Sequence, residues 1–102
     1  MVFDISKVTG IGEYTEKIED IKDGENIKTR KLYLKEDKAF LVINQNTIEL
    51  RTDQKLAKLL EEKYESVMES RYFGRGGVEI VPAGQLSTEE LEDLIRLSYN
   101  LS

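Results

Sequence analysis

Residues 48–101 constrain the fold of this chain most, because their patterns follow one another as strand, helix, loop, strand and helix. Ile48 and Leu50 alternate with Glu49 and Arg51, and this alternation predicts a half-exposed strand. Glycine-rich sequence separates the next two β-prone runs, at about 67–73 and 78–81. Helices interleaved with such strands indicate an α+β fold in which helices cover a mainly antiparallel sheet.

Capping residues predict where the two helices of this half begin. Thr52 or Asp53 caps a central helix that runs to about Tyr64. Its predicted buried stripe comprises Leu56, Leu59, Leu60 and Tyr64. Ser87 and Glu90 have the spacing of a capping box at the start of a C-terminal helix, with Leu86 placed to pack on Leu91. The inward stripe of this helix comprises Leu91, Leu94, Ile95, Ser98 and Leu101.

The first half predicts one helix and three strands. Apolar residues spaced by three and four between Asp4 and Lys22 predict an N-terminal helix, with its stripe at Val8, Ile11, Tyr14, Ile18 and Ile21. A turn is expected at Asp23-Gly24, before strands at about 27–35, 39–44 and 47–52, which short turns at 35–38 and 44–46 connect. The run 39–43 is apolar at every position, so it predicts a central strand covered on both faces.

Length and composition indicate one domain. The 102 residues suffice for a single core, and 39% hydrophobic against 34% charged residues is the balance of a folded domain. We therefore expect residues 1–102 to form one compact α+β domain with a sheet of about five strands and N-terminal, central and C-terminal helices. Without a bilayer-length apolar stretch or a signal peptide, we expect a cytoplasmic protein that does not contact membranes.

The chain contains no Cys and no His, which bears on chemistry. Disulfides, thiolate metal sites and the commonest general bases are thereby excluded. The acidic side chains that could serve an acid–base enzyme lie in patterns that predict solvent exposure; they are Glu61, Glu62, Glu65, Glu69 and Glu79. We expect no enzyme, no catalytic residue, no metal site and no cofactor.

Charge is unevenly distributed along the chain, whose net charge is −5. Residues 28–38 carry five cations against two anions, and residues 87–102 carry one cation against four anions. Two solvated faces of opposite sign are the simplest interpretation of such runs. A basic segment on an acidic protein also offers a place for phosphate groups.

The loop at residues 70–77, Ser-Arg-Tyr-Phe-Gly-Arg-Gly-Gly, combines the materials of a nucleic-acid contact. Arg71 and Arg75 can pair with phosphate, Tyr72 and Phe73 can stack on bases, and glycine lets backbone approach a ligand. The alternative is that both aromatic residues belong to the core and the glycines only turn a hairpin.

The run Ile48-Glu-Leu-Arg-Thr-Asp-Gln-Lys-Leu-Ala-Lys-Leu-Leu, followed by Ser70-Arg71, a strand and a helix ending at Ser98-Tyr99, resembles the MmcQ/YjbR-like family. This family is related to the TfoX amino-terminal domain. The resemblance covers residues 48–101 and implies a CyaY-like α+β fold with an antiparallel sheet. It also implies DNA binding, since members are usually described as putative DNA-binding proteins. Tyr72 stands where the family commonly has His, and glycines replace its Asn and later aromatic residue.

Sequence therefore predicts a small DNA- or nucleic-acid-binding domain. The predicted contact residues are Arg71, Tyr72, Phe73 and Arg75, assisted by Arg30, Lys31 and Lys35. A protein-interaction module that uses the exposed sheet or the acidic last helix, with Glu89, Glu92 and Asp93, is the alternative. Both a monomer and a homodimer agree with the sequence.

Overall fold

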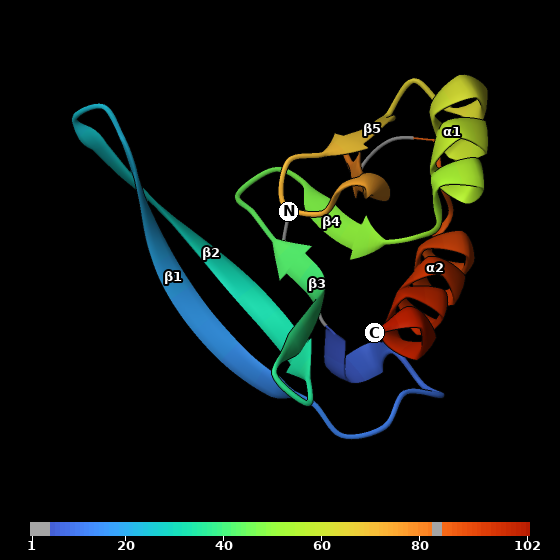
Figure 1. Ribbon diagram of the computed structural model, residues 1–102, viewed down its shortest axis with the longest axis horizontal. Coiled ribbons are helices and arrows are strands. Elements are labelled where there is room, and N and C mark those ends of the chain that lie inside the picture. The colour runs from blue at the N-terminus through green and yellow to red at the C-terminus, as the bar shows by residue number, and fades with distance from the viewer. Residues whose placement is uncertain (1–4, 83–84) are drawn as a thin grey trace.

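A computed structural model describes residues 5–82 and 85–102, and it confirms the α+β class (Figure 1). In this part of the chain, six strands form one antiparallel sheet in the order β1-β2-β3-β4-β6-β5, and two α-helices pack on it. The strands are β1 (Thr15–Asp23), β2 (Asn26–Lys35), β3 (Lys38–Ile43), β4 (Ile48–Arg51), β5 (Val67–Ser70) and β6 (Gly74–Ile80). The helices are α1 (Gln54–Lys63), α2 (Thr88–Leu101) and a short 3-10 turn, η1 (Ile5–Lys7).

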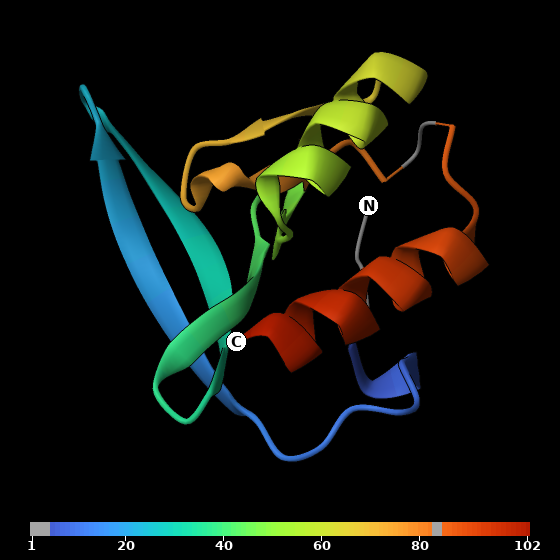
Figure 2. The ribbon, with the colours of Figure 1, turned by 45° about the vertical axis from the view of Figure 1, so that its right-hand side comes forward.

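The main core lies between the sheet and the helices. Ile48 and Leu50 of β4, together with Val78 and Ile80 of β6, are buried in one cluster with side chains of both helices. Because side chains alternate along a strand, these residues share one face of the sheet, here called the helix face. Figure 2 shows α1 and α2 lying on the same side of the sheet.

Both helix starts follow the sequence prediction. Asp53 is the N-cap of α1, and its carboxylate accepts a hydrogen bond of 2.7 Å from Leu56 N. Ser87 and Glu90 form the predicted capping box at the start of α2. The buried stripes differ in part, since Leu59 of α1 is 63% exposed and Leu101 of α2 is 47% exposed. Ala57 is the buried residue of α1, and this helix packs on β6 and β5.

The predicted turns and the central strand are confirmed. Residues 39–42 of β3 are buried, and β3 lies between β2 and β4. Glu36 and Asp37, both with positive φ, form a two-residue turn of the type I′ class between β2 and β3. Gly24, with φ 65°, opens the corresponding turn between β1 and β2. The sheet has one strand more than expected, and β1 is the additional strand.

The predicted N-terminal helix is wrong. Its first part, Asp4, lies outside the described residues, η1 spans only three residues, and Thr15–Asp23 forms a strand paired along its whole length with β2. Ile18, expected on the buried stripe, is 60% exposed. The helical spacing of the apolar residues is outweighed by strand pairing. As a strand, this segment forms nine register pairs with the ten-residue β2, which it could not form as a helix.

The β1–β2 hairpin extends beyond the rest of the sheet (Figure 1). Strand β3 pairs with β2 only from Lys31 to Lys35, so no strand of the described residues pairs with residues 26–30 of β2 on that side. We call residues 18–30 the arm. Both faces of the arm are largely exposed, which explains why its sequence lacks the apolar alternation of a half-buried strand.

Candidate nucleic-acid interface

Two glutamates are buried side by side on the sheet face opposite the helices. Glu49 of β4 and Glu79 of β6 are register partners, and each residue is 2% exposed. The sequence predicted solvent exposure for Glu79 and a half-exposed strand around Glu49, and both expectations are wrong. Like charges on neighbouring strands repel each other, so the pair requires compensating partners.

Arg71 compensates the charge of Glu79. Its Nε and Nη2 atoms donate hydrogen bonds of 2.9 and 2.7 Å to the two carboxylate oxygens, and Thr47 Oγ1 donates a third of 2.7 Å. Burial alone would raise the pKa of Glu79, but the hydrogen bonds and the charge of Arg71 hold this pKa below its ordinary value. The same hydrogen bonds raise the pKa of Arg71.

Glu49 organises the backbone of the loop between β5 and β6. Its Oε1 accepts hydrogen bonds from Ser70 Oγ (2.8 Å) and Tyr72 N (2.9 Å), and its Oε2 accepts one from Asn44 Nδ2 (2.8 Å). Ser70 Oγ in turn accepts a hydrogen bond from Phe73 N. Since all four oxygens of the two glutamates accept hydrogen bonds from the protein, the arrangement holds residues 70–73 in place.

The aromatic residues of this loop cover the second face of the sheet. Phe73 packs against a small buried cluster of Leu32, Ala39 and Val42. The rings of Tyr72 and Phe73 meet edge to face, with centroids 4.9 Å apart. Phe73 is therefore part of a core, as the structural alternative predicted, whereas Tyr72 stays 40% exposed.

Glycines allow this close packing. A Cβ at Gly77 would lie 2.5 Å from Phe73 Cβ and 2.7 Å from the Leu50 carbonyl oxygen. Gly74 has φ 69° and closes the three-residue loop that begins at Arg71. Strand β6 thus begins within the glycine run that the sequence assigned to a bend, and Gly77 makes room for the protein's own phenyl ring.

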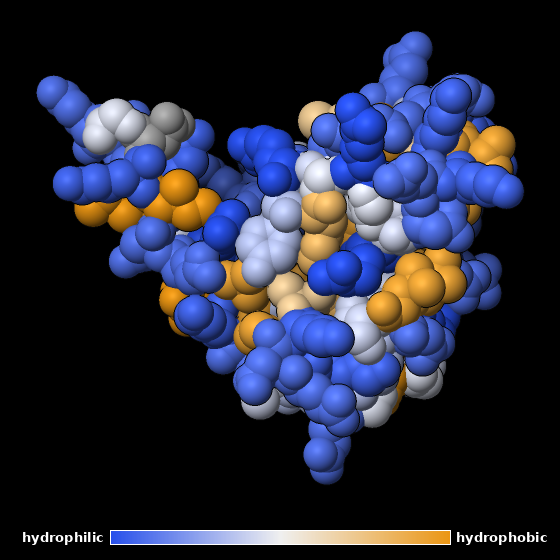
Figure 3. All heavy atoms as spheres, viewed as in Figure 1, coloured by the Kyte–Doolittle hydropathy of each residue, from blue (hydrophilic) through white to orange (hydrophobic). Residues whose placement is uncertain are grey.

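A groove of about 550 Å³ separates the arm from the body of the sheet. Figure 3 shows this hollow, bordered mainly by hydrophilic side chains. The arm contributes one wall, and residues 44–47, Glu49 and Arg71 contribute the other. Four cations line the groove: Lys28 and Arg30 on one face of the arm, Lys22, which alternates onto the other face, and Arg71 on the body of the sheet. Glu49 is its one acidic lining residue among those that the structure describes, and that carboxylate is already satisfied by protein donors.

Two of the predicted contact residues, Arg30 and Arg71, line this groove, and Tyr72 lies next to them. The guanidinium of Arg30 lies 5.0 Å from the centroid of the Tyr72 ring and forms an ion pair of 3.0 Å with Glu19. Arg71 precedes Tyr72 in the loop, so Arg30, Tyr72 and Arg71 lie next to one another, whereas Phe73 belongs to the core. We call Arg30, Arg71 and Tyr72 with the groove the arm site.

Three predicted contact residues lie elsewhere. Lys31 alternates with Arg30 onto the opposite face of β2, where it pairs with Glu16 at 3.8 Å. Lys35 is at the far end of β2, where its Nζ donates a hydrogen bond of 3.1 Å to the Tyr99 carbonyl of α2. Arg75 is exposed, and the described part of the chain offers it no hydrogen bond or ion pair. The basic segment 28–38 therefore does not form a single basic face.

Sequence reasoning missed Lys22, Lys28 and Glu49 as members of the site. Lys22 falls in the segment that the sequence assigns to a helix, whereas Lys28 belongs to the basic segment 28–38 but is not among the predicted contact residues. Glu49 and Glu79 each sit between two apolar residues of a short strand, and this shared pattern, together with Arg71, is the one signal from which a buried charged cluster could have been inferred.

The acidic helix is partly neutralised by its own residues. Arg96 pairs with Asp93 at 2.7 Å and with Glu92 at 3.7 Å, while Glu89 is exposed at the first turn. Among the residues described, no cluster of acidic side chains could hold a metal ion. Nor does any helix in residues 5–82 and 85–102 have the length and apolar character needed to cross a membrane.

We find no match to this chain among protein-family models, curated proteins or solved structures. The resemblance of residues 48–101 to the MmcQ/YjbR-like family stays a prediction from the sequence.

Proposed function

We propose that this protein binds nucleic acid, with the phosphate backbone held in the arm site. The observation that carries the proposal is that four cations line one groove of a chain whose net charge is −5. Phosphate binding requires such a local concentration of positive charge, whatever the net charge of the protein. DNA binding is also what the resemblance to the MmcQ/YjbR-like family implies, and it agrees with the expected cytoplasmic location.

The ion pair with Glu79 leaves Arg71 able to contact a ligand. A guanidinium carries five N–H donors, and the two hydrogen bonds to Glu79 use two of its nitrogens. The side chain is 74% exposed, so its remaining donors reach solvent. A cation fixed in this way loses little side-chain entropy when a phosphate binds.

The test is fluorescence anisotropy with labelled DNA and RNA oligonucleotides at several salt concentrations. The double variant Lys22→Gln/Lys28→Gln is expected to weaken binding to all sequences and to reduce the slope of log affinity against log salt by about 1.4, or about 0.7 per lost contact. The matched control is Lys55→Gln/Lys58→Gln, which makes the same charge change on exposed positions of α1.

Two results would contradict the proposal. One is the absence of binding to any oligonucleotide at low salt. The other is an equal loss of affinity in both lysine variants, because the effect would then come from net charge and not from the groove. Arg71→Ala is unsuitable for this test, since it removes the ion pair of a buried carboxylate.

One observation favours a protein partner as the second candidate function. Strand β1 is an edge strand of nine residues, and Ile18 and Ile27 are 60% and 66% exposed on the same face of the hairpin. An exposed edge strand can accept a strand from another chain, although the many charges of β1 oppose such pairing. Sedimentation of the wild type and of Ile18→Lys at increasing protein concentration tests self-association through this edge.

A further inference from the structure

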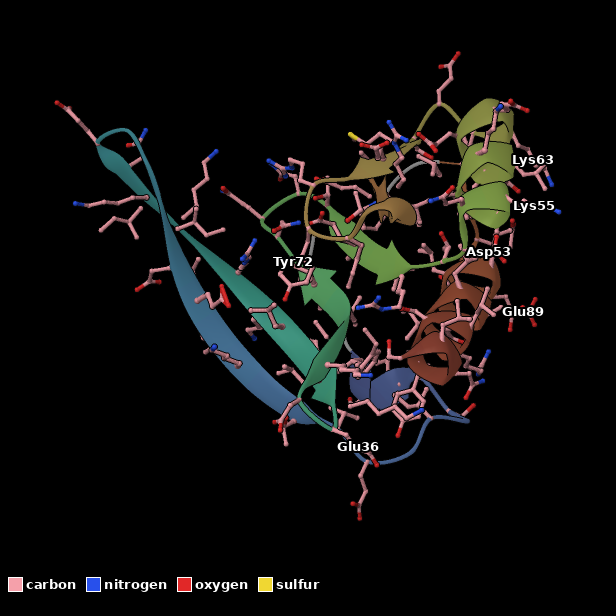
Figure 4. The ribbon with its side chains drawn as sticks, viewed as in Figure 1. Glu36, Asp53, Lys55, Lys63, Tyr72 and Glu89 are labelled. Carbon is pink, nitrogen blue, oxygen red and sulfur yellow. The ribbon has the colours of Figure 1, made fainter. Side chains whose placement is uncertain are left out.

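The ring of Tyr72 is packed by two neighbours and stays partly exposed. Its backbone N–H is bound to the buried Glu49, its ring meets Phe73 edge to face at 78°, and the guanidinium of Arg30 lies over the ring, 5.0 Å from its centroid. The residue nevertheless remains 40% exposed. Figure 4 shows Tyr72 on the loop between β5 and β6, on the side that faces the arm.

An ordered, exposed aromatic ring beside cations is a typical platform for an unpaired base. Bases stack on such rings without strong sequence preference, while neighbouring Lys and Arg side chains bind the backbone. An Arg guanidinium beside the ring adds a second planar surface on which a base can stack. The arm site places an aromatic ring and cations next to one groove.

The groove also offers polar groups of a different kind. Gln45 and Asn46 of the β3–β4 turn are exposed and line the groove, as does Thr29 of the arm. Side-chain amides both donate and accept hydrogen bonds, and they can therefore pair with the edges of unstacked bases.

The shape of the groove favours a single strand over a duplex. A duplex keeps its bases stacked inside and presents phosphates on a wide convex surface, so its bases cannot reach Tyr72. The groove volume of about 550 Å³ lies between two walls and matches a narrow, flexible chain.

We propose that the ligand of the arm site is single-stranded nucleic acid, with one base stacked on Tyr72 and the adjoining phosphates bound by Lys22, Lys28, Arg30 and Arg71. This inference rests on the proposed function and specifies its ligand.

The chain contains no Trp, which allows a direct test. In the variant Tyr72→Trp, stacking of a base on the new indole quenches its fluorescence. Titration with unlabelled ten-nucleotide single strands is expected to give strong saturable quenching, and the same sequences as a duplex are expected to bind about tenfold more weakly. Tyr14→Trp is the matched control, because Tyr14 is 36% exposed but lines a different hollow, formed with Lys35 and Tyr99. Its fluorescence is expected to stay unchanged.

A second pair of variants separates stacking from phosphate binding. Tyr72→Ala is expected to lower single-strand affinity about tenfold with an unchanged salt slope, whereas Tyr72→Phe retains the affinity. The lysine variant Lys22→Gln/Lys28→Gln is expected to reduce the slope. Thermal unfolding of each variant verifies that it is folded at the assay temperature.

The possible failures are distinguishable. Duplex binding as tight as single-strand binding, without quenching of Tyr72→Trp, would overturn the single-strand inference and leave the phosphate site intact. Equal binding of a mononucleotide or of a poly-glutamate peptide would also overturn it, because the groove would then recognise negative charge alone. Absence of binding to every oligonucleotide would refute the proposed function itself.

Discussion

The substitution Arg71→Met tests whether the buried glutamate pair depends on its ion pair. Exposed ion pairs contribute less than about 1 kcal/mol, and removing one partner of a fully buried pair costs about 3–5 kcal/mol. Here Glu79 is buried at 2% exposure while Arg71 is 74% exposed, and the hydrogen bond from Thr47 remains. The cost should fall between these limits, at about 2 kcal/mol, which lowers Tm by about 10 °C in a domain of this size.

Urea unfolding followed by circular dichroism measures this loss, and Arg75→Met is the matched control. Arg75 is an exposed arginine near the same loop, so its substitution is expected to change the unfolding free energy by less than about 0.5 kcal/mol. In the double variant Arg71→Met/Glu79→Gln, the buried charge is gone, and about half of the lost stability is expected to return. An Arg71→Met variant as stable as the wild type, or strictly additive losses in the double variant, would refute the reasoning.

Three further predictions concern stability. Because the pKa of Glu79 is lowered from 4.5, its contribution is fully present above pH about 4.5 and is lost as the pH falls through the folded-state value. Glu79→Gln should therefore show a shallower acid dependence in urea unfolding between about pH 3 and pH 7. Asp37→Gly is expected to stabilise the fold by about 0.5–1 kcal/mol, since φ is 69° at this turn position; unchanged or lower Tm would contradict this. Gly77→Ala is expected to destabilise by about 2 kcal/mol, because its Cβ would lie 2.5 Å from Phe73 Cβ; a wild-type urea midpoint would show that the loop shifts freely.

Local signals in the sequence were sufficient for the parts of the fold that local chemistry determines. The capping box at Ser87, the turn at residues 35–38 and the continuous apolar run 39–43 each depend on neighbouring residues. Such features have the same meaning in any tertiary context, and all three predictions are confirmed.

The first strand of the arm could not be predicted because it is stabilised by pairing and not by burial. Ile18 and Ile21 have helical spacing, and the nine register pairs with β2 that decide the outcome involve residues that only the turn at Gly24 brings into contact. A two-stranded segment with both faces exposed shows no apolar alternation, so periodicity gives no indication of a strand.

The buried glutamates show a different limit of sequence reasoning. Charged residues that alternate with apolar ones indicate a solvent-exposed face, unless another segment covers that face. Here the covering segment is the loop that starts at Arg71, whose own sequence was equally compatible with an exposed wing. Glu49 and Glu79 become buried when the loop closes over them. Each carboxylate accepts hydrogen bonds from the loop, and the loop excludes water from each carboxylate.

This mutual dependence changes the role that Arg71 can have in binding. A cation whose charge is offset by a carboxylate at 2.7 Å attracts fewer counterions than an isolated one, so a phosphate that contacts it releases fewer of them. The salt dependence of binding should then owe little to Arg71. Arg71 contributes directed hydrogen bonds and holds the loop, and through that loop it fixes the position of Tyr72. The arm therefore supplies three of the four cations that line the groove, and the β5–β6 loop supplies its geometry.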